Sequence, residues 1–261
     1  MKKFAFYLIL FTLLAHTTKA YQITHNTTAF LGPFNASDAN FKYDIKPQSY
    51  LVQTNIKTNN IFGTVYPFSA EYKTTGTIKN KNKFITTSYK STSKSRFNTR
   101  KKEMIYDKDG KPTYRISNKN SSNNKKVEIL PPPDNIHTTD LQTVIAEMIV
   151  QFSKMNFCKA RMHVFDGKKN FDIIFNDEGK EIITSNKYSP YEGEATKCSF
   201  YADDLGQKHD DLIFQITPQN PINVWIMHDK KTNLPFIAKL EKPSTILGKL
   251  TVYTKNIKIK D

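Results

Sequence analysis

The residues of this sequence that could carry out acid–base chemistry are few and scattered. Glu192 and Glu194 are two positions apart, so on a strand they share a face and form a candidate acid/base pair. His163 falls on the polar side of an alternating stretch, which favours a solvated histidine over a catalytic one. Asp166 and Asp172 flank an Asp-Gly turn, where carboxylates most often serve backbone geometry. The sequence supplies no cleft in which these groups would meet.

Recognisable catalytic motifs are absent from the sequence. It contains no HExxH, GxSxG, P-loop or Rossmann glycine pattern. The stretch Asp107-Lys108-Asp109-Gly110 is similar to a fragment of a calcium loop, but the other oxygen ligands and the closing Glu are missing, so we interpret it as a turn. Trp225 is interpreted as a core residue rather than a ligand platform. We therefore expect no enzyme, no cofactor and no metal.

Two cysteines, Cys158 and Cys198, are expected to form a disulfide if the chain is exported. Closing a loop of about 40 residues stabilises a fold by about 4 kcal/mol in the chain-entropy model. A buried reduced pair and a redox or metal role are the alternatives. The spacing is no metal signature, and a catalytic pair would normally be CxxC.

Residues 1–20 have the features of a secretory signal peptide. Two lysines precede an apolar run from Phe4 to Ala15, and Thr18 and Ala20 fit a cleavage site after Ala20. An uncleaved anchor is the alternative, although the run is short for a membrane span. We expect a soluble periplasmic protein that begins at Tyr21.

The chain is strongly basic. Residues 1–20 contain three lysines and no acidic residue, so their removal lowers the net charge from +15 to +12. This surplus fits an anionic partner such as a membrane surface. A coding bias is the other interpretation, because Lys, Asn, Ile and Tyr are all plentiful and the lysines are scattered. Nucleic acid is not expected as a partner of an exported chain without a binding motif.

One helix, over about residues 139–155, is predicted from apolar positions at helical spacing, with Thr138, Thr139 or Asp140 as the cap. Its apolar stripe must be buried, either against a sheet or as a lid over an apolar cavity. The stripe consists of Leu141, Val144, Ile145, Met148, Ile149, Phe152 and Met155.

A hairpin should follow the helix. Alternation on both sides of Asp166-Gly167 predicts a two-residue turn and directs Cys158 inward. In the strand-like stretch 194–201, Thr196, Cys198 and Phe200 share a face, so Cys198 can also point inward. The predicted pairs are Val164 with Lys169, Met162 with Phe171, Ala160 with Ile173, and Cys158 with Phe175. With the helix, this sheet would line a candidate apolar pocket formed by Ile145, Met148, Phe152, Met162, Phe171, Phe175 and Phe200. A solid core is the alternative.

The remaining chain is rich in aromatic and β-branched residues, which predicts antiparallel strands, including one over 61–66. Residues 21–40 are polar and are expected to be a mobile N-terminal segment. Residues 117–126 should form a solvated loop, and Pro131 to Pro133 a polyproline lead into the helix. The prediction is one mainly β domain over 41–261, a curved antiparallel sheet or open half barrel with one packed amphipathic helix.

Several motifs resemble the exported bacterial family called domain of unknown function 3108, in its proteobacterial branch. They are the stretch Val164 to Ile173, the stretch Tyr188 to Ala195 followed by Cys198, and a late segment with Val224-Trp225-Ile226 and Leu234-Pro235-Phe236. The resemblance is closest over 140–250 and looser over 43–116. It implies an envelope protein with a curved antiparallel sheet and no established activity.

Three functions remain open. The first is a non-catalytic binding or carrier module for a lipid-like or other amphiphilic ligand, and the second is a structural or assembly partner in the cell envelope. The third, least favoured, is a hydrolase with an unrecognised site. The expected partners are a lipid-like ligand, an envelope protein or an anionic membrane surface, and we expect a monomer.

Overall fold

The computed structural model of this chain describes residues 20–79, 83–119, 126–129, 138–167, 169–203, 216–245 and 248–260. The predicted signal peptide lies outside the described residues except for Ala20. Most of the predicted loop at 117–126 and the prolines at 131–133 also lie outside them.

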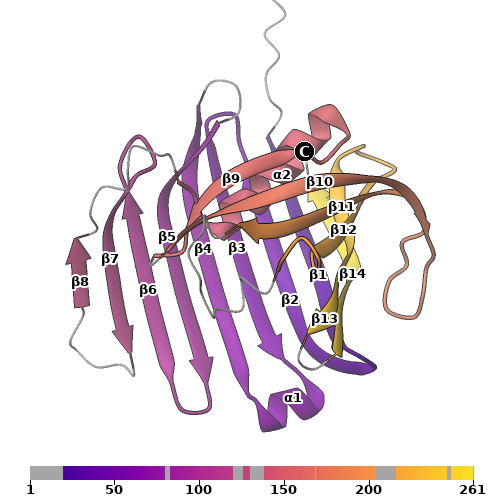
Figure 1. Cartoon of the computed structure of the whole chain (residues 1–261), viewed down its shortest axis with the longest axis horizontal. Helices are drawn as coiled ribbons and strands as arrows, with labels where there is room; N and C mark the ends of the chain where they lie inside the picture. The colour runs from indigo at the N-terminus through magenta and orange to yellow at the C-terminus, as the bar shows by residue number, and fades with distance from the viewer. Residues whose placement is uncertain are drawn as a thin grey trace, which may run out of the picture.

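A single antiparallel sheet contains all fourteen strands of the described residues (Figure 1). The strand order is β8-β7-β6-β5-β4-β3-β2-β1-β14-β13-β12-β11-β10-β9, and the end strands β8 and β9 are not paired with each other. The sheet is thus an open, curved sheet rather than a closed barrel, which confirms the predicted fold class. Its strands are β1 (Tyr21–Leu31), β2 (Phe34–Ile45), β3 (Ser49–Thr58), β4 (Phe68–Lys79), β5 (Lys83–Ser95), β6 (Thr99–Tyr106), β7 (Pro112–Lys119), β8 (Lys126–Ile129), β9 (Ala160–Phe165), β10 (Asn170–Ile183), β11 (Gly193–Asp203), β12 (Ile222–His228), β13 (Pro235–Thr245) and β14 (Gly248–Lys260).

The sheet folds over itself, so that β9 to β11 cross in front of the layer formed by β2 to β5 (Figure 1). Helix α2 (Leu141–Met155) packs inside this fold and contacts β3, β5, β9 and β13. Its length and position confirm the predicted packed helix. It ends at Asn156, which adopts the left-handed conformation with φ of 55°. We call the sheet face that α2 covers the inner face, and the opposite one the outer face.

The N-terminus of α2 is held by a buried carboxylate. Asp140 caps the helix by accepting the backbone N–H groups of Gln142 and Thr143. The same carboxylate accepts the hydroxyls of Thr74 on β4, at 2.9 Å, and Thr86 on β5, at 3.0 Å. Because the acceptor is charged and buried, these bonds fix the helix on the sheet more strongly than neutral bonds would.

The prediction of a mobile segment over 21–40 is wrong. These residues form β1 and about half of β2, and β1 lies in the middle of the sheet between β2 and β14. Ile23 and His25 are buried there. The pairing of β1 with β14 connects residues 219 to 238 positions apart, from Leu31 with Leu250 to Gln22 with Lys260, so neighbouring sequence gives no sign of it.

The strand predicted over 61–66 is also wrong, since the short helix α1 (Asn60–Val65) occupies most of that range. Strands β3 and β4 already pair with each other from Ser49 with Thr77 to Lys57 with Ser69. The residues between them therefore lie beyond the end of the sheet, where no strand partner is available, and local backbone bonds form instead.

The predicted hairpin forms, but its pairing is shifted by two residues. Phe171 pairs with Val164 and Ile173 with Met162, so the connection spans 166–169 instead of two residues. Asp166 closes it by accepting the backbone N–H of Lys169 at 2.9 Å. Because side chains alternate with a period of two, a two-residue shift keeps every apolar residue on its predicted face.

Candidate functional site

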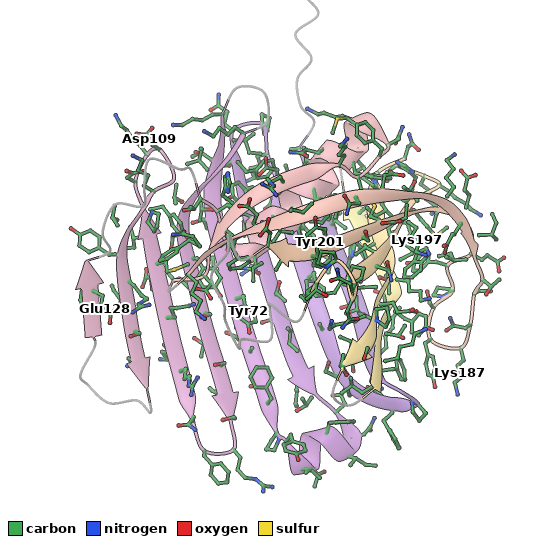
Figure 2. The ribbon with its side chains drawn as sticks, in the orientation of Figure 1. Tyr72, Asp109, Glu128, Lys187, Lys197 and Tyr201 are labelled. Atoms are coloured by element: carbon green, nitrogen blue, oxygen red, sulfur yellow. A yellow bond between two sulfur atoms is a disulfide. The ribbon has the colours of Figure 1, made fainter. Side chains whose placement is uncertain are left out.

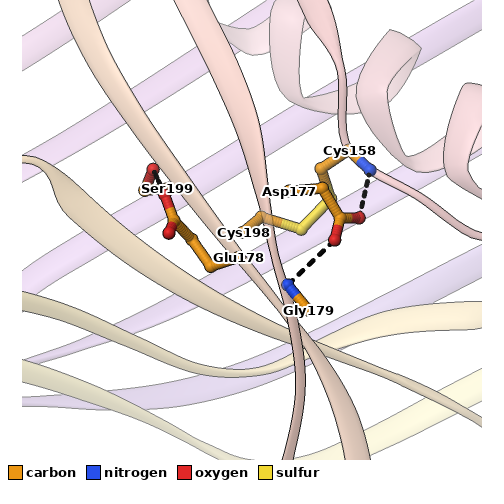
Figure 3. The surroundings of a disulfide bond; sticks show 6 residues. All are labelled: Cys158, Asp177, Glu178, Gly179, Cys198 and Ser199. Carbon is orange, nitrogen blue, oxygen red and sulfur yellow. Dashed lines mark hydrogen bonds between the residues drawn. A yellow bond between two sulfur atoms is a disulfide. The ribbon is translucent and has the colours of Figure 1, made fainter.

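Cys158, between α2 and β9, forms a disulfide with Cys198 on β11. Their Cα atoms are 5.9 Å apart and both side chains are buried. Figure 3 shows that Asp177 accepts the backbone N–H groups of Cys158, at 3.0 Å, and Gly179, at 2.9 Å. The predicted bridge is thus present, and its role is to connect the start of β9 with β11.

The structure places His163 and Asp172 side by side. Nδ1 of His163 contacts Oδ1 of Asp172, and Nε of Arg161 lies 3.4 Å from the other carboxylate oxygen. The interpretation of Asp172 as a residue that serves turn geometry is wrong, because its side chain is buried on β10 and joins β9 through these contacts. Arg161 also bonds to Asp203 at 3.2 Å. The side chains of this cluster lie on the outer face of β9, β10 and β11.

The other predicted site residues are apart from this cluster. Glu192 accepts the hydroxyl of Ser185, whereas Glu194 pairs with Lys180, each at 2.7 Å on the surface. Trp225 is 5% exposed and donates to Glu181 at 2.8 Å, which places it in the core. In the β9–β10 turn, the backbone oxygens of Asp166 and Gly167 accept Lys102 on β6 and Arg115 on β7. The turn thereby joins β9 and β10 to β6 and β7.

The seven residues of the predicted apolar pocket lie in or against a single core cluster. All belong to the largest core cluster or pack against it, and none of them lines any of the four cavities described here. They are Ile145, Met148, Phe152, Met162, Phe171, Phe175 and Phe200. These four cavities lie on the outer face, over β14 and β1 to β7.

The register of the sheet aligns a row of asparagines on the outer face. Tyr50 and Thr54 contact α2, so the next position along β3, Asn55, faces outward. Asn40 pairs with Asn55 across β2 and β3, and residues directly opposite share a face. Asn40 donates to Asn26 at 2.7 Å, and Asn26 donates in turn to Asn256 at 2.7 Å. Glu71 and Thr92 continue the row.

A groove of about 590 Å³ follows this row from β14 to β5. We call it the basic groove, because Lys57, Lys94 and Lys255 line it together with only two acids, Asp38 and Glu71. Lys255 bonds to Asp38 at 2.9 Å. Burial alone would raise the pKa of the Asp38 carboxyl, but hydrogen bonds from Thr28, Lys255 and Asn59 outweigh it and lower the pKa below its usual value.

A second hollow, of about 210 Å³, opens beside the groove and shares Lys57, Ser69 and Lys94 with it. Gly63 of α1 and Arg96 of the β5–β6 turn line its other side. The Arg96 guanidinium donates to the backbone oxygen of Thr64 at 3.0 Å, which ties this turn to α1. The hollow therefore joins the groove to the end of the sheet where α1 lies.

That end of the sheet exposes large apolar side chains. In an antiparallel meander the β1–β2, β3–β4 and β5–β6 connections lie at the same end, as Figure 1 shows for α1 and the neighbouring turns. Exposure there ranges from 50% for Val65 to 80% for Phe97. We call these residues the apolar rim: Phe34, Ile61, Val65, Tyr66 and Phe97.

The three connections of the rim, residues 31–36, 59–68 and 95–99, contain one arginine and no carboxylate. The other end of the sheet differs, because Asp109 lies there in the β6–β7 turn, far from α1 (Figure 2). Among the described residues, no group of His, Cys, Asp and Glu could hold a metal ion. No helix there is long and apolar enough to cross a membrane.

Sequence reasoning missed both the groove and the rim. The groove is lined mainly by polar residues from six strands, and only the register shows that they are neighbours. The rim did carry a signal, since three loops at alternate connections each contain an aromatic residue and no acid.

Comparison with known proteins gives one family. The model described as "Protein of unknown function (DUF3108)" matches residues 20–251. No curated protein sequence matches this chain. Among solved structures, the crystal structure of a beta-barrel-like protein of domain of unknown function DUF1849 from Brucella abortus is similar, with 8% identity and a TM-score of 0.48, over 94% of this chain and 99% of that chain.

Proposed function

Since the chain belongs to the family of proteins of unknown function DUF3108, whose description assigns no activity, we propose from its surface that it is a non-catalytic module that docks on an anionic membrane. The observation that carries the proposal is the apolar rim beside the basic groove. The lipid-like ligand expected from the sequence would then be a membrane surface bound from outside, not a molecule enclosed in the core.

The chemistry of the rim fits a lipid interface. Aromatic and aliphatic side chains that enter the headgroup layer gain from burial, and nearby Lys and Arg side chains gain from anionic lipids. Phe97 and Tyr66 would supply the apolar part, since their exposed fractions are 80% and 69%. No carboxylate in the rim connections would oppose the approach. The net charge of the chain would steer it toward the same surface over a longer range.

Vesicle flotation tests this proposal. We expect the mature chain to float with vesicles of phosphatidylglycerol and phosphatidylcholine and not with phosphatidylcholine alone, and to be released as salt rises from 50 to 500 mM. Tyr66→Ser with Phe97→Ser should weaken binding at least tenfold.

The matched control removes two exposed apolar side chains elsewhere, by Tyr114→Ser with Ile182→Ser. This variant should bind vesicles as the wild type does. Equal binding to both lipid mixtures, or equal losses in the two double variants, would contradict docking through the rim.

A second candidate, an envelope assembly partner, rests on the free edge of the sheet. Strand β8 ends the sheet, and Glu128 lies on it at the margin of the molecule (Figure 2). Val127 on β8 and Tyr114 on β7 are 59% and 45% exposed. An added strand could pair with this edge. Crosslinking from position 127 in the envelope would capture one defined protein under this alternative and lipid or nothing under the first.

A further inference from the structure

The junction of the basic groove with the smaller hollow has the arrangement of an anion site. Ser69 on β4 pairs with Lys57 on β3 and with Lys94 on β5, so the three side chains form one row on the outer face. Neighbouring strands are about 4.8 Å apart, which puts the two lysines about 10 Å apart at their Cα atoms. Both flexible ammonium groups can then reach one tetrahedral anion above Ser69.

The cations of this row are not neutralised by acids. Among the described residues neither Lys57 nor Lys94 forms an ion pair, whereas Lys90, four positions before Lys94 on the same face of β5, bonds to Glu103 at 2.8 Å. Asp38 on β2 lies directly opposite Lys57 in the same row, and Glu71 on β4 lies in the next outer-face row. Asp38 is bonded to Lys255, Thr28 and Asn59, and Glu71 makes no ion pair with either lysine.

We propose that Lys57, Ser69 and Lys94 bind the phosphate group of a phospholipid headgroup. The lysines would balance its charge and the Ser69 hydroxyl would donate to one phosphate oxygen. Arg96 lines the opposite side of the hollow and uses one guanidinium nitrogen to bond to Thr64. Its other N–H groups would donate to the phosphate from the side of the apolar rim. The acyl chains of the lipid would extend toward α1 and Phe97.

This inference rests on the proposed docking function and gives it a specific headgroup contact. The charge of the whole chain would attract any anionic surface, so the test must separate a local site from general attraction. The outer face offers a matched control in Lys42 and Lys73, which share the face and lie outside the row of Ser69. Replacing either pair of lysines by glutamine removes the same charge.

The experiment measures two ligands with the full mature chain. Calorimetric titration with inorganic phosphate reports the local site, and flotation with phosphatidylglycerol vesicles reports the lipid source. Lys57→Gln with Lys94→Gln should weaken both by about 10- to 30-fold, since each lysine near an anionic surface contributes about a factor of five. Lys42→Gln with Lys73→Gln should change either by less than threefold.

The rim variant Tyr66→Ser with Phe97→Ser distinguishes the two proposals, because it should lose vesicles and keep phosphate. Equal losses in the two lysine pairs would overturn the phosphate site and leave docking by general charge intact. Phosphate binding without any vesicle binding would instead overturn the docking function and the lipid source together. Circular dichroism spectra would show that each exposed-lysine variant is folded.

Discussion

The space under α2 and the outer face near α1 contrast in what they expose. Under α2, aromatic and aliphatic side chains fill the interior around Phe152, which is 1% exposed, and Asp140 is bonded on all sides. On the outer face, Lys57 and Lys94 line an open groove without ion pairs among the described residues, and aromatic side chains such as Phe97 reach solvent. The first region holds the fold together, and the second is available to a partner.

The difference shows where the function of a strongly patterned β protein should be sought. Alternating apolar residues predict a core, and the seven residues expected to line a pocket lie in or against the core cluster. The binding surface that we propose instead consists of residues that no sequence motif or periodicity marks. It is visible only after the register has brought Lys57, Ser69 and Lys94 into one row.

The largest effect should come from the filled interior. Phe152→Ala should lower the free energy of unfolding by about 3–5 kcal/mol, because it leaves a cavity among residues that cannot fully collapse. Urea denaturation measures it, with Leu141→Ala, at a 40% exposed position of the same helix, as the control. A loss under 1 kcal/mol would mean that α2 is a detached lid, and the comparison would fail.

Asp140→Ala should have the next largest effect. It removes the helix cap and leaves the hydroxyls of Thr74 and Thr86 without their buried acceptor, at a cost of about 2–4 kcal/mol. Asp109→Ala, on a side chain that is 59% exposed, should cost under about 0.5 kcal/mol. Similar costs for the two variants in thermal unfolding would show that Asp140 does not hold the helix.

The third prediction uses pH. Burial raises the pKa of the Glu147 carboxyl on α2 to about 7, although Gln151 and Lys83 oppose the shift. The folded state therefore binds this proton more tightly than the unfolded state, so stability falls as pH rises from about 4.5 to 7 and stays lower above it.

Glu147→Gln should stabilise the protein by on the order of 1–3 kcal/mol at pH 8 and change little at pH 4. Denaturation at the two pH values measures this. Glu194→Gln, at an exposed ion pair, serves as the control and should have the same small effect at both. A gain that does not depend on pH would place Glu147 with the exposed residues.

The smallest effect is expected on the outer face. Asn40→Ala breaks one side-chain bond of the asparagine row and should cost about 0.5–1 kcal/mol in urea denaturation. Gln53→Ala, at a neighbouring outer-face position of β3, is the control and should cost less. A loss of several kcal/mol would show that the outer row is also part of the structural framework, and would blur the contrast between the two regions.

The sequence predicted the parts of the fold that depend on local patterns. The helix follows from apolar spacing and from Asp140 as its cap, and the β9–β10 hairpin follows from alternation. Its register was missed because turn length depends on the bonds of Asp166 rather than on composition. Strand β1 was missed because its polar residues, such as the buried Thr27, lie between β2 and the distant β14 in the middle of the sheet.

The pairing of β1 with β14 also constrains how the chain folds. Gln22 lies opposite Lys260, so the middle of the sheet cannot be completed until the residues of β14 are present. Such long loops slow folding, and until β14 arrives both β1 and β13 present open edges to other chains. A chain that lost its last strand would keep those edges exposed, and its main risk would be aggregation rather than loss of a single site.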